Sequence, residues 1–252
     1  MPINFTQIIK DSFHFMQNEK RNIIVLCALY FFADIIMVLL QSAMLPNEIV
    51  VSLSNNQISS AISEEQGISL VTFFFLKQFI YIFISAWCLV TIHQISLRQF
   101  STVLQSFAST LKRIWGALLL SFLIFIPILV GLTEAMIAIQ QKVQPSIISL
   151  FAIIIGIGLY IRLCLAPVHY LLTDAGISAS AKITWRAAMG RVSVLFIFCL
   201  LIYVLVPLAE SFLISLSSNA IMAVITGIIA ALINVFALVV TYRFYTLFIA
   251  KA

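Results

Sequence analysis

Charged residues are scarce in this sequence. Lys, Arg, Asp and Glu together make up 9% of the 252 residues, whereas hydrophobic residues make up 63%. Soluble domains carry about 25% charged and about 45–50% apolar residues. The composition therefore excludes a soluble enzyme, and the high apolar content also excludes a disordered chain. With a mean hydropathy of +1.15, the sequence predicts a multi-pass membrane protein.

Cysteine and histidine are rare as well, with four cysteines and three histidines in the chain. Each cysteine lies alone in an apolar segment, where a free thiol behaves as a small apolar side chain. This pattern excludes a disulfide scaffold. The histidines are His14, His93 and His169, and their spacing matches no metal motif. We therefore expect no metal site and no other cofactor.

The usual motifs of catalysis are missing too. The chain has no phosphate-binding glycine loop, no HExxH and no nucleophile elbow. The segments between its apolar stretches are too short for a separate soluble domain, which needs on the order of 40 residues. We expect a non-enzymatic protein that acts in the membrane or at its surface. The net charge is +5. We attribute it to basic residues that set the orientation of the chain in the membrane and face anionic lipid, and we expect no nucleic-acid binding.

Six apolar stretches are long enough to cross the hydrocarbon core, which takes about 20 residues per helix. The sequence predicts one all-α transmembrane domain over 1–252, with spans at 22–45, 68–92, 115–139, 147–166, 192–214 and 220–242. The longest loop on the outer side is 46–67. The first stretch contains Asp34 and lacks a suitable cleavage site, so it is interpreted as a retained span and not as a signal peptide.

Basic residues are distributed unequally between the two sides of the predicted spans. Eleven of the 14 Lys and Arg residues fall in the two tails and in the loops on the same side as the N-terminus. Lys142 alone lies in a loop on the opposite side. Because loops rich in Lys and Arg stay cytoplasmic, both termini are predicted to be cytoplasmic.

A threefold pattern precedes the odd-numbered spans. Basic amphipathic segments carry Ser12-Phe13, Ser106-Phe107 and Thr184-Trp185, and Ser106 is assigned to a water-facing side. They predict a threefold repeat, each copy with an interfacial helix and a hairpin of two spans. The expected contacts with anionic lipid headgroups are Lys20, Arg21, Lys112, Arg113, Arg186 and Arg191. These helices either only anchor the hairpins, or they form a surface that senses lipid or docks a membrane-protein partner.

Two opposite charges lie at nearly the same depth in the first hairpin. Asp34 is about 18 Å and Lys77 about 16 Å from the inner boundary, at about 1.5 Å per helical residue. Charges at this depth are costly, so we predict an ion pair between Asp34 and Lys77. The pair either fixes the register of the hairpin or forms a site for a proton or ion.

Carboxyl groups also recur near the outer ends of the third and fifth spans. Glu134 and Glu210 follow Pro127 and Pro207, which are expected to kink their helices. The two carboxyls could form an outer vestibule or could simply be solvated. In the last span, small residues at 223, 227 and 231 predict close helix packing, and Asn234 is expected to link helices. Gly156-x-Gly158 is also interpreted as a packing feature.

Motifs along the whole chain resemble those of a known family. They are Met1-Pro2-Ile3, Asp11-Ser12-Phe13-x-Phe15, Asn18, Leu165-Ala166-Pro167-Val168 and Tyr242-Arg243-x-Tyr245. They resemble the YciC-like family of uncharacterised inner-membrane proteins of gammaproteobacteria. The resemblance implies the bacterial inner membrane and six spans, and it implies no activity. A fainter likeness, to the membrane domain of some glycerophosphodiester phosphodiesterases, hints at work on lipids.

Two functions stay open on the sequence alone. The first is a non-enzymatic envelope protein that acts as a scaffold, a partner or a lipid-interacting factor, which the basic amphipathic segments favour. The second is a transporter or channel for a small solute or ion, which the intramembrane Asp34 and Lys77 favour.

Overall fold

A computed structural model describes residues 4–44, 64–99, 102–216 and 219–250 of the chain. These residues are predominantly helical and contain no β-strand. Leu45 at the end of the predicted first span, residues 46–63 of the predicted outer loop and the opening Met1-Pro2-Ile3 lie outside them. The prediction of an all-α protein is confirmed for the described residues.

Within these described ranges, six segments are long and apolar enough to cross a membrane, as the sequence predicts. They are formed by α2 (Lys20–Met44), α4 (Glu64–Ser96), α5 (Val103–Gln140), α6 (Ile147–Leu163) with α7 (Ala166–Leu172), α9 (Val192–Cys199) with α10 (Val206–Ser215), and α11 (Ala220–Ala250). Two shorter helices, α1 (Phe5–Asn18) and α8 (Ile177–Ala187), precede the first and fifth of these segments.

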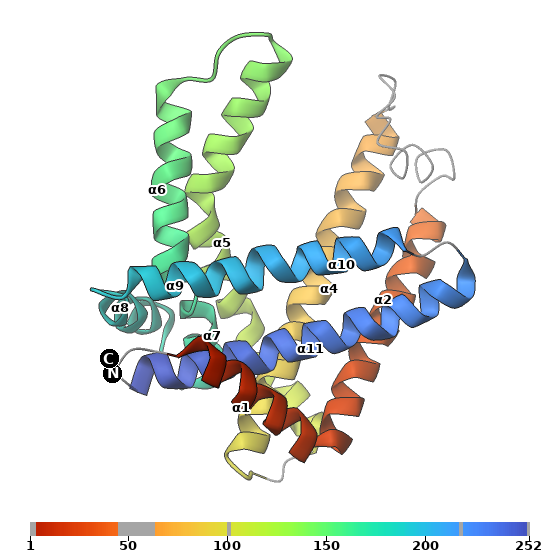
Figure 1. Ribbon diagram of the computed structural model, residues 1–252. Helices are drawn as coiled ribbons and strands as arrows, with labels where there is room; N and C mark the ends of the chain where they lie inside the picture. The colour runs from red at the N-terminus through yellow and green to blue at the C-terminus, as the bar shows by residue number, and fades with distance from the viewer. Residues whose placement is uncertain (1–3, 45–63, 100–101, 217–218, 251–252) are drawn as a thin grey trace.

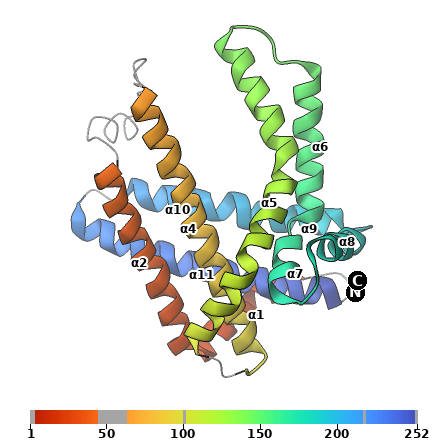
Figure 2. The same ribbon diagram turned by 180° about the vertical axis from the view of Figure 1, so that it is seen from behind.

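The last helix, α11, is the central element of the arrangement. Together with α9 and α10 it runs across α2, α4 and α5, whereas α5 and α6 form a long hairpin whose far half projects away from the other helices (Figures 1 and 2). Helix α11 packs against α1, α2, α4 and α10. Elements from both ends of the chain therefore meet on one helix.

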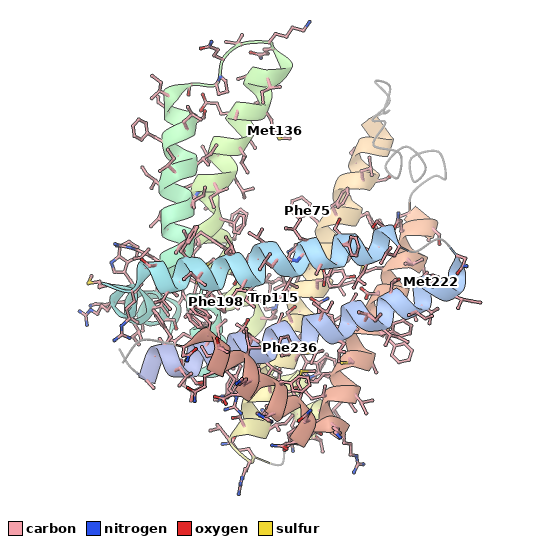
Figure 3. All side chains as sticks on the ribbon, in the orientation of Figure 1. Phe75, Trp115, Met136, Phe198, Met222 and Phe236 are labelled. Atoms are coloured by element: carbon pink, nitrogen blue, oxygen red, sulfur yellow. The ribbon has the colours of Figure 1, made fainter. Side chains whose placement is uncertain are left out.

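Aromatic side chains fill the core where α1 and α9 meet α11. The ring of Phe244 stacks on Phe198 at 4.2 Å, on Phe248 at 5.5 Å and on Phe5 at 5.7 Å between centroids. Phe198 and Phe244 are fully buried. Figure 3 shows Phe198 among the helices that run across α2, α4 and α5. We call Phe5, Phe198, Phe244 and Phe248 the aromatic junction.

The α5–α6 hairpin is held together differently. A Cβ added to Gly156 would lie 2.8 Å from the backbone nitrogen of Ile128, and one added to Gly131 would lie 2.8 Å from the Ser149 carbonyl oxygen. The two helices therefore approach so closely that only glycine fits. The packing prediction for Gly156-x-Gly158 holds for Gly156, whereas nothing lies within 4 Å of a Cβ at Gly158.

The second amphipathic segment differs from its prediction. It runs directly into the third span within α5, a single helix from Val103 to Gln140, but one of its residues faces the other way. Ser106 is buried at 1% exposure and donates a hydrogen bond to the side-chain oxygen of Gln94, so its assignment to a water-facing side is wrong. A hydroxyl can be buried at this position because α4 supplies an acceptor.

Two of the six segments are interrupted. The fourth breaks between α6 and α7 at Cys164 and Leu165, directly before Pro167. The fifth contains a π-helical segment, Leu200–Leu205, directly before α10 and Pro207. Proline has no backbone N–H to donate to the preceding turn, which weakens the α-helical pattern before Pro167 and Pro207. Pro127, by contrast, lies inside the continuous helix α5.

Candidate functional site

A cavity of about 410 Å³ lies where the six segments converge, and each of them contributes to its lining. Both interruptions reach its wall, through Cys164 and Pro167 in the fourth segment and through Tyr203 and Pro207 in the fifth. The remaining wall is largely apolar. Its polar residues are Tyr30, Gln78, Tyr81, Ser85, Ser121, Tyr160, Tyr203, Glu210, Asn234 and Thr241.

Asp34 and Lys77 both meet Tyr81 at the cavity wall. The Tyr81 hydroxyl donates a hydrogen bond to the Asp34 carboxyl group. The Lys77 ammonium lies 6.0 Å from the centroid of the Tyr81 ring, because residues four apart share one face of a helix. Within the described residues, the structure shows no direct ion pair between Asp34 and Lys77. The two groups thus come together around a tyrosine that the sequence reasoning did not select.

A second link between α2 and α4 lies next to the first. The hydroxyl groups of Tyr30 and Ser85 are 2.6 Å apart. Tyr30 precedes Asp34 by four residues, and Ser85 follows Tyr81 by four, so the two links occupy consecutive turns of both helices. This regular spacing of polar residues within apolar spans is the sequence signal that could have identified the second pair.

Glu210 belongs to the central cavity. Its carboxyl oxygen accepts a hydrogen bond from the Asn234 side-chain amide, which joins α10 to α11, and Asn234 thus links helices as expected. Tyr81, the hydrogen-bond partner of Asp34, lines the same cavity as Glu210. Glu134, on α5, is not among the residues that line this cavity. The structure therefore groups Glu210 with Tyr81, the partner of Asp34, instead of with Glu134.

The six basic residues expected at lipid headgroups fall into two sets. Arg113 contacts Asp174 at 2.8 Å and the Ala175 carbonyl oxygen at 3.0 Å, which ties α5 to the segment before α8. Arg191 contacts the Phe248 carbonyl oxygen at 3.4 Å. The other four are exposed, and they are Lys20, Arg21, Lys112 and Arg186.

The motifs that carry the family resemblance converge near the aromatic junction. His169, directly after Leu165-Ala166-Pro167-Val168, lies 2.7 Å from the Tyr245 hydroxyl through its Nδ1. The Arg243 guanidinium lies 5.1 Å from the centroid of the Phe15 ring. His93 lies 3.3 Å from the Tyr242 hydroxyl. Three motifs far apart in the sequence therefore form one packed unit, which the sequence reasoning did not foresee.

No group of three or more His, Cys, Asp or Glu residues is placed to hold a metal ion in the part of the chain that the structure describes. Some of the polar groups at the cavity wall are instead hydrogen-bonded across helices: Tyr30 with Ser85, and Glu210 with Asn234. Such pairing satisfies hydrogen bonds where no water is available.

Comparisons with known proteins identify one relative. No family model matches this chain, and no solved structure matches it. An uncharacterised protein of Haemophilus influenzae, a gammaproteobacterium, is 39% identical over 250 residues. The match covers 98% of this chain and 99% of the Haemophilus protein. The protein therefore belongs to the same family as this Haemophilus influenzae protein.

Proposed function

We propose that this protein is a non-enzymatic membrane protein that holds an amphiphilic molecule, such as a lipid, in its central cavity. The cavity of about 410 Å³ carries this proposal, because polar groups gather on an otherwise apolar wall between membrane-spanning helices. Ligand pockets of this kind bury an apolar body and orient it with a few polar groups. A lipid or similar amphiphile offers both parts.

The hydrogen bonds that the polar groups of the cavity wall already make favour a binding role over catalysis. The Tyr81 hydroxyl is engaged with Asp34, Tyr30 with Ser85, and Glu210 with Asn234. A catalytic centre needs a nucleophile or an acid and base that face a common reacting atom. The cavity wall offers hydrogen-bonded helix contacts in place of such a pair.

We further propose that the protein lies in a bacterial inner membrane with both termini in the cytoplasm, and that its family is the YciC-like family. The excess of Lys and Arg on one side of the spans supports this orientation. Helix α1 packs against α11, and Phe5 stacks on Phe244 near the end of the chain. Helices from both ends of the chain therefore share one end of the bundle.

The threefold amphipathic repeat is part of the proposal. Ser12, Ser106 and Thr184, which occupy equivalent places in the pattern, are all at most 2% exposed. Phe13, which follows the first of them, is 56% exposed. In the first copy, the buried Ser12 hydroxyl beside the outward Phe13 ring suits a helix that packs on the bundle and also touches the bilayer interface. The exposed basic residues would then meet anionic lipid headgroups or a membrane-protein partner.

Native mass spectrometry of the protein released from lipid nanodiscs tests the cavity. The variant Ser121→Phe places a ring in the cavity, because Ser121 lines it. The variant Ser109→Phe makes the same change at an exposed position of the same helix. We expect the wild type and Ser109→Phe to retain a bound lipid mass that Ser121→Phe loses. If all three carry the same lipid, the cavity is not the binding site.

A second candidate function is transport of a small solute or ion. The observation that favours it is the pair of interrupted segments at the cavity wall, since transporters build substrate sites from discontinuous helices. The double variant Asp34→Asn, Lys77→Met tests it in the same experiment. A discrete small bound mass that the wild type carries and this variant loses would favour transport. Identical spectra with exchangeable lipid alone would leave the pair structural.

A further inference from the structure

One carboxyl group and several aromatic rings, but no basic residue, belong to the described lining of the central cavity. Among the described residues, its lining contains no Lys, Arg or His. It contains the carboxyl group of Glu210 and four tyrosines, which come from four different membrane segments: Tyr30, Tyr81, Tyr160 and Tyr203. A wall with a carboxyl group and no basic residue should favour cationic ligands over anionic ones.

Three aromatic rings of the cavity lining contact one another in sequence. The Tyr160 ring meets Phe125 at 5.2 Å and Tyr203 at 5.3 Å between centroids, both edge to face. All three residues line the cavity. The face of an aromatic ring is electrostatically negative and attracts a cation within about 6 Å. A cluster of such rings is a common way to bind an organic cation out of water.

One cation already lies near a cavity tyrosine, and it does not balance the acidic groups. The Lys77 ammonium lies 6.0 Å from the Tyr81 ring, but the Lys77 side chain is exposed and is not part of the lining. The Asp34 carboxyl shares Tyr81 with this ammonium, whereas Glu210 on the wall has no basic residue beside it in the described lining. An added positive charge in the cavity would compensate the second carboxyl.

We propose that the occupant of the cavity is an organic cation with an apolar body, in the class of amines and quaternary ammonium compounds. The inference rests on the proposed binding function and names the ligand class of the same cavity. The apolar wall takes the body of the ligand, the tyrosine rings face its cationic group, and Glu210 supplies the opposite charge.

Calorimetric titration of the protein in nanodiscs tests the ligand class, with empty nanodiscs subtracted. The probes are benzyltrimethylammonium and benzenesulfonate, two aromatic ions of similar size and opposite charge. We expect benzyltrimethylammonium to bind and benzenesulfonate not to bind. Glu210→Gln keeps an oxygen that can accept from Asn234 but removes the charge, and we expect it to weaken cation binding by about tenfold or more. Glu134→Gln removes a carboxyl outside the cavity lining and should leave the affinity unchanged.

A second pair of variants keeps the test decisive if Glu210→Gln does not fold. Tyr203→Phe retains the ring and should retain affinity, whereas Tyr203→Leu removes the ring and should weaken cation binding several-fold. Equal binding of the two ions, or unchanged affinity in both Glu210→Gln and Tyr203→Leu, would overturn the cationic ligand class. The binding function itself would still stand in that case if Ser121→Phe lost its lipid, so the two failures are distinguishable.

Discussion

The aromatic junction and the far half of the α5–α6 hairpin are both apolar, but different surroundings cover them. At the junction Phe198 and Phe244 are fully buried by other parts of the protein. On the hairpin Met136 is 65% and Ile148 77% exposed, and Figure 3 shows Met136 on the projecting part of α5. The first region is a protein core, whereas the second depends on the bilayer to cover its side chains.

This difference shows that the hydrophobicity of a segment does not indicate whether protein or lipid covers it in a membrane protein. Lipid tails are as apolar as leucine, so burial between helices brings little hydrophobic gain, and close van der Waals contact has to stabilise the fold. The junction achieves this contact with stacked rings, and the hairpin achieves it with glycines. The central cavity lies between the two regions, where contact is incomplete.

The largest effect is expected from Phe244→Ala at the aromatic junction. The change removes stacking on three other rings and leaves a void, so we expect a loss of about 3 kcal/mol in the free energy of unfolding. Phe151→Ala on the hairpin is the matched control, because Phe151 is 60% exposed and should cost far less. Unfolding by denaturing detergent in mixed micelles measures both. Equal losses would remove the distinction between the two regions.

The next largest effect is expected where the hairpin helices touch. In Gly156→Ala the new Cβ would lie 2.6 Å from Cγ1 of Ile128 and 2.8 Å from its backbone nitrogen. We expect this crowding to destabilise the protein by about 1–3 kcal/mol. Gly158→Ala has free space around its Cβ and should be neutral or slightly stabilising, since alanine favours a helix. Melting temperatures in one detergent compare the two, and similar values would show that the hairpin does not depend on this contact.

A smaller effect is expected from the polar contacts beside the junction. Tyr245→Phe removes the partner of the buried His169 Nδ1, 2.7 Å away, and should cost about 1 kcal/mol. Tyr242→Phe removes the longer 3.3 Å contact to His93 and should cost less. The same unfolding assay resolves this order. A larger loss in Tyr242→Phe would contradict the assignment of His169 and Tyr245 as the stronger link.

The smallest effect is expected at the cavity wall. Asn234→Ala breaks the hydrogen bond to Glu210 between α11 and α10, and contacts of this type are worth about 0.6 kcal/mol in membrane proteins. Ser211→Ala, at an exposed position of α10, is the control and should have no effect. A loss as large as that of Phe244→Ala would show that this wall is part of the structural core and not a site with room for a ligand.

Much of the candidate site could be found from polar residues in apolar spans. Asp34, Glu210 and Asn234 are conspicuous in the sequence because polar groups in hydrocarbon are costly, and the structure places Glu210 and Asn234 on the cavity wall and Asp34 behind Tyr81. Their partners were harder to predict. Tyrosine is an ordinary residue in a membrane span, and nothing in the sequence around Tyr81 indicates that its hydroxyl contacts Asp34. The partner of each group depends on how the helices are tilted and rotated, which only packing determines.

The sequence by itself determined that the chain has six helices long enough to span a membrane, because apolar length and internal backbone hydrogen bonding are local properties. It also marked Gly156 as a packing position. Only the tertiary structure decided that α11 crosses the bundle, that both interrupted segments reach one cavity, and that Glu210 shares this cavity with Tyr81, the partner of Asp34. These features depend on the fit between segments distant in the chain, which local sequence patterns do not encode.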